Sequence, residues 1–311
     1  MRPSSLSDTL AIRTPGTPRR PALRLLPYLL IAPSVALLLA LIAYPLAFAL
    51  RNSFYFWNLQ MSPAPLAFIG LGNYSLALTS SSFIASLENT VILTVAGVAI
   101  EFALGLAIAL VLSAQLPGMA PARALLIMPT TVAPIVVGFL FRYMYDPSAG
   151  LVTWLLRSLD VPVPATGLLG SQTTALASIM FADVWEWTPF FAIVLYAGLL
   201  AVPQQLIEAA LLDRASDWTI FCRIKLPLIR RTALIVLMLR FMQLFNTFDL
   251  VLVLTHGGPG TSSRTLAYAL YEQGMVQFNI GLASAMTWII VLIVNALIAL
   301  YVFFAFRDWE W

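Results

Sequence analysis

The sequence has little charge and few of the residues that build most catalytic and metal sites. Only 10% of its 311 residues are charged, against about a quarter in an ordinary soluble domain. Cys222 is the only cysteine and His256 the only histidine, so neither a disulfide framework nor a Cys/His zinc site can form within the chain. The basic, aromatic-studded face that nucleic-acid binding requires is also missing. These absences argue against a soluble fold, a zinc enzyme and a nucleic-acid partner.

Long apolar runs take the place of those residues. Apolar side chains make up 60% of the sequence, and the run from Leu25 to Leu50 carries no charge. As an α-helix this run would be about 39 Å long, enough to cross a hydrocarbon core about 30 Å thick. The same argument predicts five further spans. We therefore predict an all-α membrane protein of about six transmembrane helices, at about 25–50, 89–112, 122–144, 173–201, 232–254 and 281–306.

The distribution of Lys and Arg predicts how the chain is oriented in the membrane. Residues 1–24 carry five arginines among Pro, Ser and Thr, a composition that favours a disordered tail. The segment 203–231 carries five more cations, whereas the opposite side has only Arg51, Arg157 and Arg264. Because cytoplasmic loops are rich in Lys and Arg, we predict a cytoplasmic tail over 1–24, a membrane domain over 25–311, and both termini in the cytoplasm.

Several ionisable side chains fall inside the predicted spans. Each would cost about 2.5 to 3.5 kcal/mol at the bilayer centre, so these side chains should face protein or water rather than lipid. Arg142 and Asp249 lie near span ends and can snorkel, and we interpret Glu101 as a structural, hydrogen-bonded residue. The full set is Glu101, Arg142, Asp183, Glu186, Arg240 and Asp249.

The segment 203–231 is the most unusual loop of the chain. Pro203 suits a helix start, and the strong helix formers Glu208-Ala209-Ala210-Leu211-Leu212 follow it. Ser216 suits the N-cap of a second helix, which Pro227 would interrupt. The residues predict two short helices at an angle on the basic side of the membrane. By physics alone, an amphipathic connector lying on the bilayer surface fits them equally well.

This loop resembles the EAA loop of binding-protein-dependent ABC importer permeases. Arg214 stands where that family usually has Gly, and an Arg is strained at the positive φ that Gly allows, so a variant turn or an altered ATPase groove is expected there. Three other segments, in the expected order, resemble the carbohydrate branch of the family, the maltose and glycerol-phosphate type permeases: Phe68 to Tyr74, Trp185 to Pro203, and Phe245 to Pro259. The residues that match the EAA motif are Glu208-Ala209-Ala210, Asp213, Ala215, Phe221 and Ile224-Lys225-Leu226-Pro227.

The resemblance implies a type I ABC importer permease of the bacterial inner membrane, which forms half of the translocation pore for a sugar or sugar-like solute and is not an enzyme. It implies as partners a second permease in a heterodimer, two ATP-binding-cassette ATPase subunits, an extracytoplasmic solute-binding protein, and membrane lipid. No cofactor is expected in this chain, because it has no G-x-x-x-x-G-K-[ST] loop and ATP would bind to the ATPase. The residues expected to couple to the ATPase are Glu208, Ala209, Ala210, Asp213, Arg214, Ala215 and Phe221.

Two clusters are the candidates for contact with the solute, one on neighbouring turns of the fourth span and one on a single face of the fifth span at spacings of three and four. Sugars offer hydroxyls for hydrogen bonds and flat CH faces for stacking, so polar and aromatic side chains inside the membrane suit them. Pairing of Asp183 or Glu186 with Arg240, which would make the intramembrane charges tolerable, is an equally open explanation. The predicted pore-lining residues are Asp183, Glu186, Trp187, Phe190, Arg240, Gln243, Leu244 and Thr247.

The alternative function is an ion-coupled secondary transporter. It would use the intramembrane carboxylates Glu101, Asp183 and Glu186 as a relay. That alternative gives no reason for the long segment 203–231.

Overall fold

A computed structural model describes residues 22–114 and 119–306 of the chain. The chain divides into two compact units, Met1–Phe48 and Ala49–Trp311. Helix α1 (Ala22–Ser53) runs across the boundary between them. Residues 1–21 of the predicted tail lie outside the described residues. Helix α1 begins at Ala22, three residues before the start predicted for the first span.

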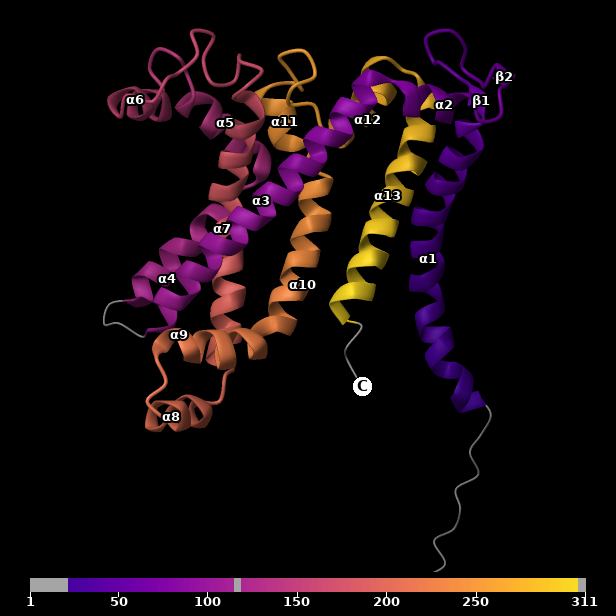
Figure 1. Ribbon diagram of the computed structural model, residues 1–311. Helices are drawn as coiled ribbons and strands as arrows, with labels where there is room; N and C mark the ends of the chain where they lie inside the picture. Colours follow the sequence, from indigo (N-terminus) through magenta and orange to yellow (C-terminus); the bar gives the residue numbers. More distant parts are fainter. Residues whose placement is uncertain (1–21, 115–118, 307–311) are drawn as a thin grey trace, which may run out of the picture. The chain divides into compact units, whose positions relative to one another are not determined.

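The described residues are almost entirely helical (Figure 1), as the apolar runs predict. Among the described residues, five helical segments are long and apolar enough to cross a membrane, or up to six if a bent helix pair counts as one span. This matches the prediction of about six spans. The five are α1, α3 (Ser81–Ser113), α7 (Ala175–Leu200), the run Asp217–Leu254 that contains α10 (Leu226–Phe245), and α13 (Ile280–Phe306).

The predicted third span, 122–144, is not one straight helix. Helix α4 (Met119–Ile127) continues into the 3₁₀ turn η1 (Met128–Thr131), and α5 (Pro134–Met144) then leaves at an angle of 96°. Pro129 lies in the 3₁₀ turn and Pro134 begins α5. A proline lacks the backbone N–H of a helix interior and pushes the residue before it into an extended conformation, so the chain turns here.

A group of short elements lies at one end of the second unit, at the top of Figure 1. Strands β1 (Tyr55–Phe56) and β2 (Ala67–Phe68) form a small antiparallel ribbon. The side chain of Asn73 holds the start of this ribbon, because its Nδ2 donates to the carbonyl oxygens of Ser53, at 2.9 Å, and Tyr55, at 2.8 Å. The other short elements of this group are α2 (Gly72–Thr79), α6 (Leu151–Ser158), α11 (Asp249–Leu254), α12 (Leu266–Tyr271) and the π turn η3 (Glu272–Val276).

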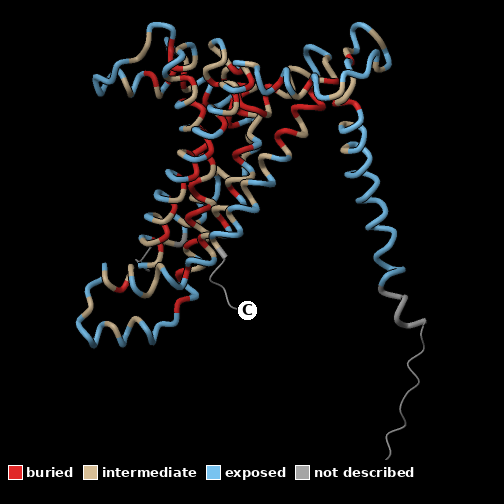
Figure 2. The backbone as a smooth tube through the Cα atoms, turned by 45° about the vertical axis from the view of Figure 1, so that its right-hand side comes forward, coloured by how far each residue is buried: buried red, intermediate tan, exposed pale blue. Residues whose placement is uncertain are grey.

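The core of the second unit is the packing of α3 against α7 and α10, where buried residues concentrate (Figure 2). Small residues on α3 allow the close approach that helix packing in a membrane requires. A Cβ at Gly105 would collide with the backbone and Cβ of Phe191 on α7, and one at Gly97 would stand 2.9 Å from a methyl of Leu244 on α10. These contacts determine which faces of α7 and α10 are buried against α3.

Candidate functional site

Arg240 on α10 is the centre of a buried charge network between three helices. Its side chain is 2% exposed. Its Nε donates to Oε2 of Glu101 on α3 at 2.8 Å, and its Nη2 donates to Oε1 of the same carboxylate at 2.9 Å. The Nη2 group also donates to Oδ2 of Asp183 on α7. The network therefore ties α3, α7 and α10 together at one level.

This network accounts for three of the charges that the sequence places inside spans. A bidentate pairing of guanidinium and carboxylate provides strong, charge-assisted hydrogen bonds that offset part of the loss of hydration. Glu101 is thus a structural, hydrogen-bonded residue, as interpreted from the sequence. Of the two explanations left open for Asp183, the structure shows that it does pair with Arg240.

An aromatic side chain covers the network on one side. The Arg240 Cζ lies 4.7 Å from the centre of the Trp187 ring, a cation–π contact. The Trp187 ring in turn meets Phe190 edge to face, with 6.0 Å between ring centres. Trp187 is only half-buried, so part of its ring remains free for a further contact.

A polar pocket of about 210 Å³ opens beside Arg240 and Trp187. Helix α10 ends at Phe245 and α11 begins at Asp249, so the backbone at Asn246, Thr247 and Phe248 is not helical at this point. Irregular backbone inside a membrane domain is tolerated where it is buried in protein or lines a water-filled cavity. The pocket is lined by Pro134, Asp183, Trp187, Arg240, Gln243, Asn246, Thr247, Phe248, Asp249 and Leu250.

The pocket brings together five of the eight residues predicted to line the pore. Thr247 reaches it from the break after α10 and not, as the spacing of three and four predicted, from a face of a continuous helix. The sequence reasoning did not assign Pro134, Asn246, Phe248, Asp249 and Leu250 to the site. The sequence does contain an indication of these residues. Asn246 to Asp249 belong to a segment that resembles the family, and their polar side chains are unfavourable in an unbroken transmembrane helix.

The other three predicted residues lie outside the pocket. Leu244 is fully buried in the core beside Gly97. Successive residues of an α-helix are about 100° apart around its axis, so Gln243 and Leu244 point to different sides of α10. The direction of Arg240 lies between those of these two residues, and its side chain reaches both the pocket and the buried core. Phe190 packs on the core between Trp187 and Phe191.

Glu186, the third, is completely buried on α7. Neither of its carboxylate oxygens accepts a hydrogen bond from any described residue. The structure does not pair it with Arg240, in contrast to Asp183.

The segment 203–231 contains the two short helices that the sequence predicted. The first, α8, runs from Gln204 to Leu212, directly after Pro203. It ends in a tight turn, because the N–H of Arg214 donates to Leu211 O and the N–H of Ala215 donates to Ala210 O, each at 3.0 Å. This pair of bonds is the Schellman motif. Arg214 has a φ of 56°, so the turn forms as it would around Gly, with a strained Arg in its place.

The second helix, α9 (Asp217–Ile220), begins where the sequence placed its N-cap. The Ser216 hydroxyl accepts a hydrogen bond from the N–H of Thr219 at 3.2 Å. The prediction that Pro227 interrupts this helix is wrong, since the π turn η2 (Phe221–Lys225) continues directly into α10. In the π turn the N–H of Leu226 reaches back five residues to Phe221 O, and this wider winding relieves the clash of a proline ring with the preceding turn.

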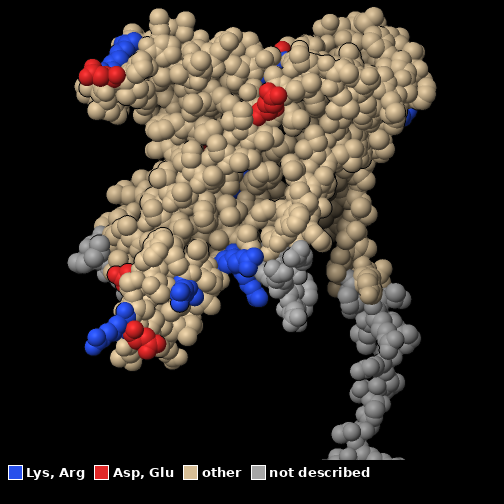
Figure 3. Space-filling view, in the orientation of Figure 1, with Lys and Arg blue, Asp and Glu red and all other residues tan. Residues whose placement is uncertain are grey.

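The two short helices project from one end of the second unit, below α7 and α10 in Figure 1. Basic and acidic side chains gather there (Figure 3). Large apolar side chains are exposed among them, with Leu212 at 87% and Trp218 at 72%. Of the predicted coupling residues, Ala210, Ala215 and Phe221 are half-buried. The exposed ones are Glu208, Ala209, Asp213 and Arg214.

The sequence of this chain matches a known protein family and several of its members. Residues 104–307 match the family described as binding-protein-dependent transport system inner membrane component. The trehalose transport system permease protein SugA of Mycobacterium tuberculosis is 35% identical over 274 residues, covering 88% of this chain and 86% of SugA. The trehalose/maltose transport system permease protein MalF of Thermococcus litoralis is 38% identical over 270 residues, covering 85% of this chain and 89% of MalF. The sn-glycerol-3-phosphate transport system permease protein UgpA of Agrobacterium fabrum is 32% identical over 279 residues, covering 89% and 93%.

Solved structures share the fold. A chain in the crystal structure of a bacterial ABC transporter involved in the import of the acidic polysaccharide alginate superposes with a TM-score of 0.80 at 19% identity. The match covers 93% of this chain and 98% of that one. The bacterial alginate ABC transporter in complex with an alginate pentasaccharide-bound periplasmic protein gives a TM-score of 0.78, also at 19% identity, over 92% and 96%.

Proposed function

Because this chain belongs to the binding-protein-dependent transport system inner membrane components, the permeases of ABC importers, we propose that it forms half of a translocation pore for a sugar or sugar-like solute. A permease of this kind is a membrane pore subunit and not an enzyme. Its transport is driven by ATP hydrolysis on separate subunits, so membership in the family decides against the ion-coupled alternative.

The observation that carries the solute assignment is the polar pocket between α7, α10 and α11. Gln243, Asn246 and Thr247 bring amide and hydroxyl groups into a membrane domain, and Trp187 and Phe248 bring aromatic rings. This is the mixture that a sugar requires. The names of the relatives agree with it, since they specify trehalose, maltose and sn-glycerol-3-phosphate. In this proposal the Arg240 network holds the pocket wall in place.

An ABC importer permease works with ATPase subunits and a solute-binding protein. We propose further that two ATPase subunits take part and that a second, different permease completes the pore. In this arrangement α8 and α9 seat in a groove of one ATPase. The exposed Leu212 and Trp218 support this role, because a surface that stays in water would gain nothing from such side chains.

The protein is an inner-membrane component. For its orientation we propose that α8, α9 and both termini are cytoplasmic, with a tail over 1–24 and the membrane domain over 25–311. The cations of the segment 203–231 support this, because they follow the positive-inside rule.

Transport by the complete importer in proteoliposomes, with its binding protein outside and ATP inside, tests the solute site. Trehalose, maltose and sn-glycerol-3-phosphate are the first solutes to try. Gln243→Ala combined with Thr247→Val removes two hydrogen-bonding groups from the pocket and should reduce transport about tenfold or more, since each such bond contributes about 1 kcal/mol. Hydrolysis of ATP stimulated by the binding protein should remain.

Ser158→Ala is the matched control, because Ser158 is exposed on α6 and its hydroxyl donates only to Trp154 O of the same helix. Unchanged transport in both the double variant and Trp187→Ala would contradict the pocket as the solute site. Absence of transport of every solute by the native importer, with normal stimulated hydrolysis, would count against the proposed solute class instead.

A further inference from the structure

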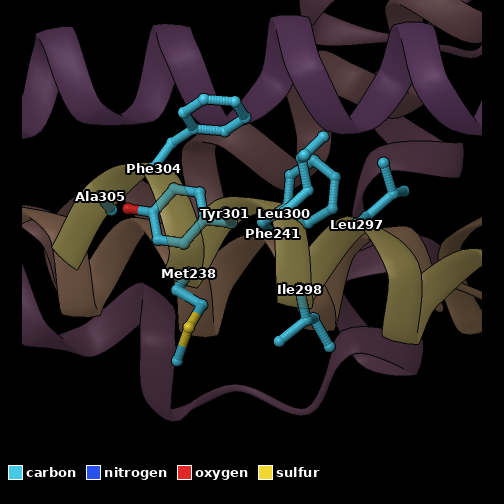
Figure 4. A pocket seen from close by; sticks show the side chains of 8 residues that line it. All are labelled: Met238, Phe241, Leu297, Ile298, Leu300, Tyr301, Phe304 and Ala305. Atoms are coloured by element: carbon cyan, nitrogen blue, oxygen red, sulfur yellow. The ribbon is translucent and has the colours of Figure 1, made fainter. Parts of the chain in front are cut away.

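Helix α10 lines a second cavity, a groove of about 460 Å³ that it forms with α13 (Figure 4). The side chains of the groove are apolar except for the hydroxyl of Tyr301, which already donates to Leu234 O at 2.7 Å. Such a groove offers the hydroxyls of a sugar no hydrogen-bonding partner. The polar pocket beside Arg240 is lined by charged groups instead, and the balance of these charges determines which solutes it can accept.

Asp249 brings a carboxylate without a partner into the polar pocket. It stands in the first turn of α11 and is half-buried. Asp183, the other acidic residue of the lining, is bound to Arg240. Within the part of the chain that the structure describes, no ion pair or hydrogen bond involves the side chain of Asp249. An ionised carboxylate accepts hydrogen bonds through two oxygens and donates none, so Asp249 offers a solute two acceptors.

Negative groups outnumber positive groups around this pocket. Arg240 is the one cation of the lining, against Asp183 and Asp249. Two further carboxylates lie close by. Glu101 is bound to Arg240, and the buried Glu186 interacts electrostatically with Arg240 and Asp249. Even if both glutamates were uncharged, two aspartates would still face one guanidinium. A buried site screens such an imbalance much less than water does.

The other basic side chains of the surrounding helices lie too far away to restore the balance. Helices α3, α7 and α11 carry no Lys or Arg. On α5, Arg142 lies about 12 Å along the helix from Pro134 of the lining, and its Nη1 donates to Val253 O at 3.0 Å. On α10, Arg231 lies about 14 Å along the helix from Arg240. Both arginines are exposed, and exposed charges farther apart than a Debye length of about 10 Å are largely screened.

The Arg240 guanidinium is only partly available to a solute. Its Nε and Nη2 groups donate to Glu101 and Asp183. The Nη1 group takes no part in these bonds, so it can donate to a solute oxygen. The pocket thus presents a donor at Arg240 and acceptors at Asp249. A sugar hydroxyl can both donate and accept, whereas an ionised phosphate or carboxylate group only accepts and is repelled by Asp249.

On the basis of the function proposed above, we propose that Asp249 makes the pore selective for neutral sugars. Its two oxygens accept hydrogen bonds from neighbouring hydroxyls of the solute, and such bonds to an ionised group are about twice as strong as those between neutral groups. Its charge excludes phosphorylated and acidic sugars. Trehalose and maltose fulfil this condition, and sn-glycerol-3-phosphate does not.

Thiol labelling inside the pocket tests this selectivity in the complete importer, without its binding protein, so that the pore alone selects. The reporter is Asn246→Cys in a Cys222→Ala background, because Asn246 is exposed, lines the pocket and uses its Nδ2 to bind Met242 O. Trehalose and maltose consist of glucose units, so glucose and glucose 6-phosphate are matched probes. Glucose should slow labelling by a small uncharged thiol reagent, and at least about tenfold more glucose 6-phosphate should be needed for the same effect.

Variants of Asp249 in this background separate its charge from its shape. Asp249→Asn should require about tenfold more glucose for protection, because charge-assisted bonds are lost. The two probes should then protect within about threefold of each other, since the repulsion of the phosphate is reduced. Asp249→Glu keeps the charge and should still exclude glucose 6-phosphate.

Asp160→Asn is the matched control, since Asp160 is exposed after α6 and asparagine tolerates its φ of 55°. It should behave like the importer with native Asp249, and co-purification with the ATPase verifies that each variant assembles. Equal protection by the two probes with native Asp249, or a preference for glucose that persists in Asp249→Asn, refutes the role of Asp249 and leaves the pocket as the proposed solute site. Protection by neither probe refutes the solute pocket together with its selectivity.

Discussion

At the scale of single residues, the Arg240 network has more negative than positive groups. One guanidinium serves two carboxylates, those of Glu101 and Asp183. Removal of one partner from a buried ion pair leaves the other charge without compensation, at a cost of about 3 to 5 kcal/mol. The three members of the network are therefore not equivalent, and the loss of the arginine should be the most damaging.

This asymmetry gives a prediction for stability. Arg240→Gln leaves two carboxylates buried and should lower the free energy of unfolding by about 3 to 5 kcal/mol. Glu101→Gln keeps Arg240 paired with Asp183 and should lower it by only about 1 to 2 kcal/mol. Chemical unfolding of the purified protein in detergent, followed by tryptophan fluorescence, measures both. Asn295→Ala is the control, since its exposed amide donates only to Val291 O in the same helix. Equal losses in the two network variants would contradict the asymmetry.

A second prediction concerns Arg214, which closes the turn after α8 with a φ of 56°. A side chain in this conformation is strained by about 1 kcal/mol or more, and glycine is not. Arg214→Gly should therefore stabilise the turn and slow amide exchange at residues 206–219 about fivefold, as hydrogen–deuterium exchange can measure. Arg214→Ala keeps the strain and removes the charge. If Ala slows exchange as much as Gly does, the charge and not the backbone is responsible.

At the scale of elements, the sequence predicted which segments are helical better than how they end. The hydropathy of 122–144 suggested one span, although Pro129 and Pro134 stand at the break. An average over such a window does not register a bend that two prolines impose. At Pro227 the error was the opposite, because the sequence predicted an interruption that does not occur. The π turn before this proline accommodates it, and no distinctive amino-acid composition marks such a turn in the sequence.

The pair α8 and α9 is the element that we propose to couple the chain to the ATPase, and it gives a third prediction. Ala209 is exposed, and its small side chain permits close contact with a partner surface. Ala209→Trp should leave membrane insertion intact, but it should abolish co-purification with the ATPase or the stimulation of hydrolysis by the binding protein. Gln204→Trp, exposed about 140° away around α8, is the control and should retain both. Normal assembly and stimulation in Ala209→Trp would favour a connector lying on the bilayer surface.

At the scale of the whole molecule, the sequence located both halves of the pocket without showing how they join. Helical spacing grouped Asp183 with Trp187, and Arg240 with Gln243, within their own spans. The hydrogen bonds from Arg240 to Glu101 join residues that are 139 positions apart in the sequence, and no local sequence pattern specifies such a pairing. The break at Asn246 to Phe248 also depends on packing between helices, because the polar residues there are tolerated only where protein or a cavity surrounds them.

The last prediction tests how the molecule lies in the membrane. In a Cys222→Ala background, a cysteine at Ala64 sits in the exposed loop of the β1–β2 ribbon, and one at Gln205 sits on exposed α8. These positions are at opposite ends of the second unit in Figure 1, and the cations near α8 favour the cytoplasmic side for it. An impermeant thiol reagent should therefore label Ala64→Cys in right-side-out membrane vesicles and Gln205→Cys only in inverted ones. The reverse pattern would place α8 and α9 outside the cell, where an ATPase has no ATP to hydrolyse, and would remove the physical basis of the coupling proposal.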